Sequence, residues 1–153
     1  VYEHEKQQLG ERTNLISLGN LLDDMGEYEK GHRYFEKVLH ELVADSPDIS
    51  KCYEGLGSIV AHRGDYNSAL ALYNKALEQD LKTIPSNNPK IADDYNRIAV
   101  VYDETGRFEL ALQYYDSALK IYVSFYGEDH VKTSYAYNNI GVTLWKQKRY
   151  SRA

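Results

Sequence analysis

Several kinds of residue are scarce in this chain, and each scarcity excludes something. Cys52 is the single cysteine, so no disulfide can form within the chain, and a reducing compartment, the cytoplasm, is the simplest expectation. The longest apolar stretches, such as residues 98–102, are far shorter than the roughly 20 residues that cross a bilayer, so we expect no membrane insertion. Basic residues are outnumbered, 18 against 23 acidic ones, and a formal charge of -5 disfavours nucleic acid as a partner.

The sequence also lacks the motifs that carry catalysis. It has no Gly-rich phosphate loop, no spacing typical of metal ligands and no nucleophile in a recognised motif. Cys52 lies beside the apolar Tyr53, which favours a buried structural thiol over a reactive one. We therefore predict no catalytic residues, no metal and no cofactor.

What the chain does contain is an internal repeat. Four copies of one pattern each open on an aliphatic residue followed by a small one, and an aromatic residue follows nine or ten positions later. Successive pairs lie 38, 42 and 42 residues apart. The pairs are Leu18-Gly19, Leu56-Gly57, Ile98-Ala99 and Ile140-Gly141, and the aromatic residues are Tyr28, Tyr66, Phe108 and Tyr150. Periods of this length indicate stacked supersecondary units, which more often build binding surfaces than catalytic pockets.

Each copy predicts a helical hairpin. Apolar or small residues at i, i+3, i+4 and i+7 predict a first helix, as in Leu15, Leu18, Gly19 and Leu22. Glycine inside a helix costs up to about 1 kcal/mol relative to alanine, so we expect a second helix to cross there at close range. A short break containing glycine ends each of the first three first helices, and the three prolines all lie between hairpins.

These positions resemble the tetratricopeptide repeat, over about residues 13–153. The 42-residue steps and the segments Ala118-Leu119-Lys120-Ile121 and Tyr137-Asn138-Asn139-Ile140-Gly141 are similar to kinesin light chain repeats, whereas Val131 and Lys148 depart from that pattern. The resemblance implies an all-α fold, a right-handed superhelical solenoid of stacked antiparallel helical hairpins. We assign residues 1–10 to the end of a preceding helix, 13–45, 51–83 and 93–126 to three repeats, and 135–153 to the first helix and turn of a fourth.

By the same resemblance, the concave groove of the solenoid takes an extended peptide. Asparagine suits this role because its amide donates and accepts hydrogen bonds at once. The residues that we predict to contact a peptide are Asn20, Asp23, Glu54, Ser58, Asn96, Arg97, Asp103, Asn138, Asn139 and Trp145. The asparagines could instead be solvated polar positions, and Trp145 could instead pack against the second helix of the fourth repeat.

The charges of the predicted groove favour a neutral or basic partner segment. Its carboxylates are Asp23, Asp24, Glu54, Asp93, Asp103 and Glu104, and its fixed cations are Lys51, Arg97 and Lys146. We thus predict a scaffold or adaptor that binds a protein or peptide. Two alternatives stay open: a regulatory or targeting arm of a larger enzyme, and self-association through Tyr137, Ile140 and Leu144.

Overall fold

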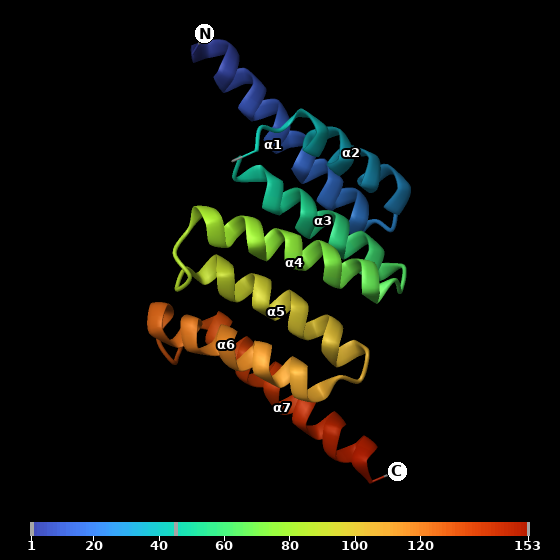
Figure 1. Ribbon diagram of the computed structural model, residues 1–153, viewed down its shortest axis with the longest axis vertical. Coiled ribbons are helices and arrows are strands. Elements are labelled where there is room, and N and C mark those ends of the chain that lie inside the picture. The colour runs from blue at the N-terminus through green and yellow to red at the C-terminus, as the bar shows by residue number, and fades with distance from the viewer. Residues whose placement is uncertain (1, 45, 153) are drawn as a thin grey trace. The chain divides into compact units, whose positions relative to one another are not determined.

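The computed structural model describes residues 2–44 and 46–152, and within them it has seven helices and no strand (Figure 1). The all-α prediction is therefore confirmed. The helices are α1 (Tyr2–Asp24), α2 (Tyr28–Glu41), α3 (Asp48–His62), α4 (Tyr66–Thr83), α5 (Pro89–Glu104), α6 (Phe108–Tyr126) and α7 (Val131–Ser151). Val1, Asp45 and Ala153, which end three of the predicted ranges, lie outside the described residues.

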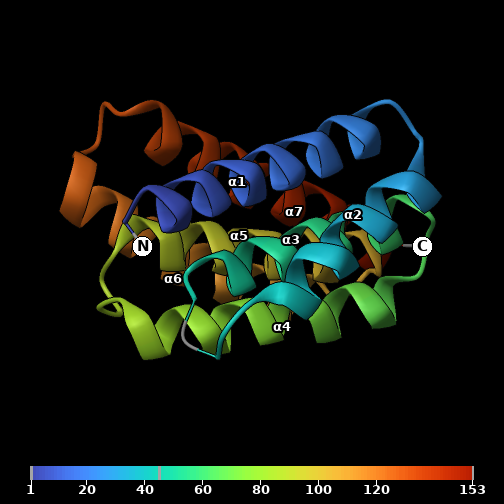
Figure 2. The ribbon, with the colours of Figure 1, turned by 90° about the horizontal axis from the view of Figure 1, so that it is seen from above.

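The chain divides into two compact units, the first up to Gln79 and the second from Asp80 onward. The first unit contains α1 to α3 and most of α4, and the second contains the end of α4 with α5 to α7. Within each unit consecutive helices reverse direction, as Figure 2 shows for α1, α2 and α3 and Figure 1 shows for α5, α6 and α7. The reversals occur where predicted: Gly26 and Gly106 have φ angles of 76° and 75°, which glycine adopts at little steric cost.

Two of the predicted helix boundaries are wrong, one in α1 and one in α7. Residues 2–10 do not end a separate helix, because α1 runs without interruption from Tyr2 to Asp24. At the other end, α7 continues through Lys148 to Ser151, so the predicted turn of the fourth repeat does not form there. The reason is local: the first three hairpins turn at a glycine with positive φ, whereas Lys148 favours continued helix.

The core of the first unit forms around the ring of Phe35 on α2. This ring is fully buried with Ile16, Val38 and Leu56 around it. It lies between Gly19 of α1 and Gly55 of α3, where an added Cβ atom would approach ring atoms to 2.8 Å and 2.2 Å. Gly57 faces the ring of Tyr73 on α4 in the same way, at 2.6 Å. The expected close crossing of a second helix over the glycine of the first is thus confirmed at Gly19 and Gly57.

The second unit buries smaller residues beside tyrosine rings. Ala99 of α5 packs with Ala111 and Tyr115 of α6 in one cluster. Ala92 and Ala136 pack with Ala118 and Tyr122 in another, which joins α5, α6 and α7. These contacts hold α5 and α7 against α6 and fix the surface that they present.

Candidate protein-interaction surface

A series of polar contacts connects α5 to α7, and we call it the polar ladder. At its first rung, both carboxylate oxygens of Asp93 accept hydrogen bonds from the Lys132 ammonium at 2.7 Å. At the middle rung, Asn139 Nδ2 donates to Asn96 Oδ1 at 3.2 Å. The polar ladder therefore joins residues about 40 positions apart. It connects α5 and α7, the predicted first helices of the third and fourth repeats, directly to each other.

The third rung of the polar ladder is buried. Asp103 is only 8% exposed, and it accepts a hydrogen bond from the Thr143 hydroxyl at 2.8 Å and another from the Lys146 ammonium. The bond to Asp103 raises the pKa of Lys146 above its usual value. A buried carboxylate needs such partners, because an ionised group without them would cost several kcal/mol.

Tyr122 adds a contact from α6 to the first rung. Its hydroxyl donates to Asp93 at 2.5 Å, and burial together with this bond raises the pKa of the phenol. Three helices consequently meet at one carboxylate. This arrangement holds α5, α6 and α7 in a single register.

The first unit has an equivalent of the buried rung between α1 and α3. Asp23 is 6% exposed, and its two oxygens contact the Ser58 hydroxyl at 2.6 Å and the His62 ring nitrogen Nδ1 at 2.8 Å. In both units an aspartate near the end of one predicted first helix thus accepts from a hydroxyl and a nitrogen on the next. Both carboxylates are largely buried and already bond to partners within the chain, and a peptide contact at Asp23 or Asp103 stays a prediction.

The other predicted contact residues differ in exposure. Asn20, Asn138 and Trp145 are exposed, with Trp145 at 60%, whereas Glu54 and Ser58 are half-buried. Arg97 is half-buried and extends its guanidinium to Asp94. Asn96 and Asn139 are half-buried and bond to each other, as described above. The structure therefore brings six of the predicted residues to α5 and α7, and Asn138 and Trp145 are the exposed ones among them. The six are Asn96, Arg97, Asp103, Asn138, Asn139 and Trp145.

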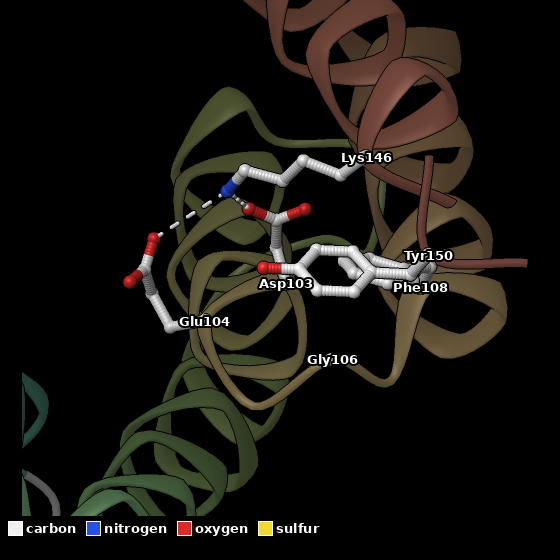
Figure 3. Close-up of a pocket in the computed structure, with 6 residues that line it drawn as sticks. All are labelled: Asp103, Glu104, Gly106, Phe108, Lys146 and Tyr150. Atoms are coloured by element: carbon white, nitrogen blue, oxygen red, sulfur yellow. Dashed lines mark hydrogen bonds and ion pairs between the residues drawn. The ribbon is translucent and has the colours of Figure 1, made fainter. Parts of the chain in front are cut away.

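A pocket of about 340 Å³ lies at the end of the polar ladder, where α5 turns into α6. Figure 3 shows the Lys146 ammonium between the carboxylates of Asp103 and Glu104, with the rings of Phe108 and Tyr150 stacked beside them. The ring centroids are 5.7 Å apart and the planes differ by 24°. Glu104 is half exposed, and its oxygen is 3.7 Å from Lys146. The pocket thus combines an accessible carboxylate with an aromatic wall.

Sequence reasoning identified Tyr150 as a repeat position but missed this pocket. The prediction placed a turn before Tyr150, whereas the continuation of α7 keeps Tyr150 on the same helix as Lys146 and stacks it on Phe108. It also missed Lys132 and Thr143. Their spacing of 39 and 40 residues from Asp93 and Asp103 is close to the repeat period, and that was the available signal.

The single cysteine of the chain, Cys52, is buried. Burial raises the pKa of the Cys52 thiol to about 12, so the thiolate needed of a nucleophile is scarcely populated at neutral pH. None of the helices in the described part of the chain is long and apolar enough to cross a membrane.

The fold and this surface define a class of protein, the α-solenoids built from antiparallel helical hairpins. Models of the tetratricopeptide repeat match residues 16–82 and residues 90–153, and the chain belongs to the tetratricopeptide repeat family. Its repeats make it a scaffold for protein–protein interaction, and repeats of this family are generally non-catalytic. No match was found among curated proteins.

Solved structures with the same fold include kinesin-light-chain-like proteins and a secretion chaperone. BtubC (BKLC) from P. vanneervenii is 26% identical, with a TM-score of 0.81 over 94% of this chain. A putative kinesin light chain with nearly identical TPR-like repeats from Podosopora anserina is 14% identical, with a TM-score of 0.77 over 90% of this chain and 68% of that one. The type III secretion translocator chaperone SycD of Yersinia enterocolitica is 17% identical, with a TM-score of 0.67 over 89% of this chain and 85% of that one. The chain spans 59% of the length of BtubC.

Proposed function

We propose that the chain binds an extended segment of a partner protein along α5 and α7. The observation that carries this proposal is an exposed stripe on α7 that contains Asn138, Val142 and Trp145. These residues are spaced i, i+4 and i+7, so they share one face of the helix. On α5, Val100 is also exposed.

The stripe offers the two kinds of contact that an extended segment requires. The Asn138 amide can donate to a backbone carbonyl and accept from a backbone N–H at the same time. Trp145 supplies a large apolar surface, the type of side chain that most often dominates the energy of an interface. The polar ladder holds α5 and α7 in place before binding, which reduces the ordering cost of association.

For the charge of the segment, we keep the proposal that it is neutral or basic, although the reason changes. Asp93 and Asp103 already have ammonium partners and no longer count as free charges of the groove. The support comes instead from the pocket, which Glu104 lines together with the stacked rings of Phe108 and Tyr150; Glu104 is half exposed and is the more distant of the two carboxylates that share the Lys146 ammonium, at 3.7 Å. A carboxylate beside aromatic faces suits a lysine or arginine side chain, which can form an ion pair and a cation–π contact together.

This function can be tested with matched sets of unstructured 12-residue peptides that differ only in carrying arginine or glutamate. We expect the arginine set to bind more tightly, and Asn138→Ala with Trp145→Ala to weaken binding about tenfold or more. Gln113→Ala, an exposed change on α6, serves as the control. Tighter binding of the glutamate set would contradict the charge proposal, and unchanged affinity in the double variant would contradict the surface.

The free thiol of Cys52 supports a cytoplasmic location. Cys52 is a buried free thiol, and proteins of reducing compartments commonly keep such thiols. Fractionation of cells that produce the whole protein would test this placement, and recovery in a secreted fraction would contradict it.

A further inference from the structure

Two helices of the second unit begin in the same way, one repeat period of 42 residues apart. Asn88 precedes α5 and His130 precedes α7, and both have extended backbone, with φ and ψ of -69° and 137° at Asn88 and of -79° and 146° at His130. Each side chain accepts a hydrogen bond from the backbone N–H two residues later. Asn88 Oδ1 accepts from Lys90 at 2.9 Å, and His130 Nδ1 accepts from Lys132 at 3.2 Å. Both side chains therefore act as N-caps.

The two N-caps differ in their response to a proton. The side-chain oxygen of Asn88 accepts a hydrogen bond at any pH, whereas Nδ1 of His130 accepts only while it carries no proton. A protonated imidazole has two donors and no acceptor, so neither of its nitrogens can replace the lost bond. Since imidazole changes its charge between about pH 5 and 8, the cap of α7 depends on pH and the cap of α5 does not.

The start of α7 is also a poor place for a positive charge. Its first turn contains no acidic residue, and the N–H groups at the end of the helix carry a partial positive charge that repels an imidazolium. The first position of α5 is Pro89, whose fixed φ favours the start of a helix, whereas α7 has Val131 there. The start of α7 consequently relies on its cap more than the start of α5 does.

Tyr126, at the end of α6, holds the His130 imidazole in the capping orientation. The two rings stack with their centroids 4.0 Å apart and their planes 8° apart, and both residues are half-buried. The face of the tyrosine ring attracts an imidazolium, which opposes the effect of the lost cap. The lost acceptor and the repulsion by the helix end both act in the other direction, and together we expect them to exceed this attraction.

The charged groups near His130 are exposed or already paired. Glu128 and Asp129, in the loop before α7, are exposed, so water and salt screen their attraction for an imidazolium. From α5, Asp93 faces this turn and binds the Lys132 ammonium at 2.7 Å, which leaves the pair without net charge. The cap bond and the helix end therefore decide the effect of the proton.

From these observations we propose that His130 makes the attachment of α7 to the second unit dependent on pH, and that acid releases the first turn of α7. This turn carries Lys132, which binds Asp93, and Thr133, which is fully buried and donates to the Gly127 carbonyl at 2.7 Å. Without the cap, the turn that positions both side chains frays. The proposal goes beyond the binding of an extended segment and does not depend on it, because its test measures the chain alone.

His130→Asn isolates the proton-sensitive bond, because it gives α7 the side chain that caps α5. Urea unfolding of wild type and variant gives the ratio of folded to unfolded chain for each. Between pH 7.5 and pH 5, we expect this ratio to fall about fivefold to tenfold further in wild type than in the variant, from the lost cap and the new charge at the helix end. The other four histidines are common to both proteins, so their titration cancels in the comparison.

A second measurement uses the wild-type chain alone. Long-range proton–nitrogen NMR spectra of the histidine rings distinguish protonated from unprotonated ring nitrogens. At pH 7.5 we expect Nδ1 of His130 to be unprotonated and Nδ1 of His62, which lies 2.8 Å from the Asp23 carboxylate, to carry a proton. His62 is the matched control, because its bond to Asp23 survives protonation. The Lys132 amide should lose protection from hydrogen exchange between pH 7.5 and pH 5, after correction for the intrinsic rate.

The proposal is overturned if the two pH values change wild type and His130→Asn equally. It is also overturned if wild type gains on the variant in acid, which would mean that Tyr126 and the loop carboxylates favour the imidazolium. A protonated Nδ1 of His130 at pH 7.5 would exclude the cap bond itself. Circular dichroism at pH 7.5 checks that the variant folds. If it does not, the Lys132 amide of wild type still decides, and unchanged protection in acid would contradict the release of this turn.

Discussion

Replacing Gly55 by alanine should destabilise the first unit, although alanine is the better helix former. The added Cβ would lie 2.2 Å from Phe35 Cζ, well inside van der Waals contact. The ring cannot move away, because its other side is against Gly19 and the residue is fully buried. Either α3 or the ring must shift, and each shift disturbs the core that surrounds Phe35.

The magnitude follows from two opposing terms. Overpacking a core costs about 1–3 kcal/mol, and this overlap places Gly55→Ala at the upper end. Alanine recovers about 1 kcal/mol of helix propensity, which leaves a net loss of about 2 kcal/mol. The matched control is Gly141→Ala on α7, where a Cβ meets no atom within 4 Å of the described residues, so it should gain about 1 kcal/mol.

The assay is urea unfolding followed by circular dichroism, with amide hydrogen exchange to assign the loss to residues of the first unit. The two variants should differ by about 3 kcal/mol in the free energy of unfolding, from the sum of the steric and propensity terms. Phe35→Leu in the Gly55→Ala background should recover part of the loss, because leucine lacks the ring edge that clashes. Equal stabilities for Gly55→Ala and Gly141→Ala would refute the steric reasoning.

Three further predictions concern the polar ladder and the thiol. Asp103→Asn should lower the free energy of unfolding by about 2 kcal/mol at pH 7, because it removes the nearer of the two carboxylates that pair with Lys146. Pairing with Asp103 raises the pKa of Lys146 in the folded chain. The ion pair therefore contributes its full stabilisation below the unfolded-state pKa of about 10.5, and this stabilisation is lost as pH rises through the folded-state pKa. The urea midpoints of wild type and variant should accordingly converge above pH 10.5. Alkylation of Cys52 by iodoacetamide at pH 8 should be about 100-fold slower in the native chain than in urea, because burial raises the pKa of the thiol to about 12. Labelling at equal rates in the two conditions would contradict this burial. A double-mutant cycle of Asn96→Ala and Asn139→Ala should give a coupling of about 0.5–1.5 kcal/mol, and additive losses would mean that the two amides do not bond in solution.

The fold was predictable because its signals are local. The spacing around Leu18 and Gly19 identifies a helix face from only a few residues, and glycine in that face indicates close crossing by a second helix. Both inferences need no knowledge of how distant helices are rotated. They therefore succeeded at Gly19 and Gly57, where the rings of Phe35 and Tyr73 approach.

The candidate surface was only partly predictable because it depends on helix rotation. Successive residues are about 100° apart around a helix, so an error of one position moves a side chain to another face. Val142 is exposed, while its neighbour Thr143 is buried against Asp103. The burial of Asp103 and the pairing of Asn96 with Asn139 arise from this rotation, which periodicity alone does not determine.

The buried aspartates of the two units have a consequence for recombining repeats. Asp23 meets a serine and a histidine, whereas Asp103 meets a threonine and a lysine, so the two junctions use different pairs of donors. A hairpin transplanted from one position to another would bring an aspartate without its complementary donors. Chimeric arrays made from this chain should accordingly keep adjacent first helices together, with the junction rather than the single hairpin as the exchangeable module.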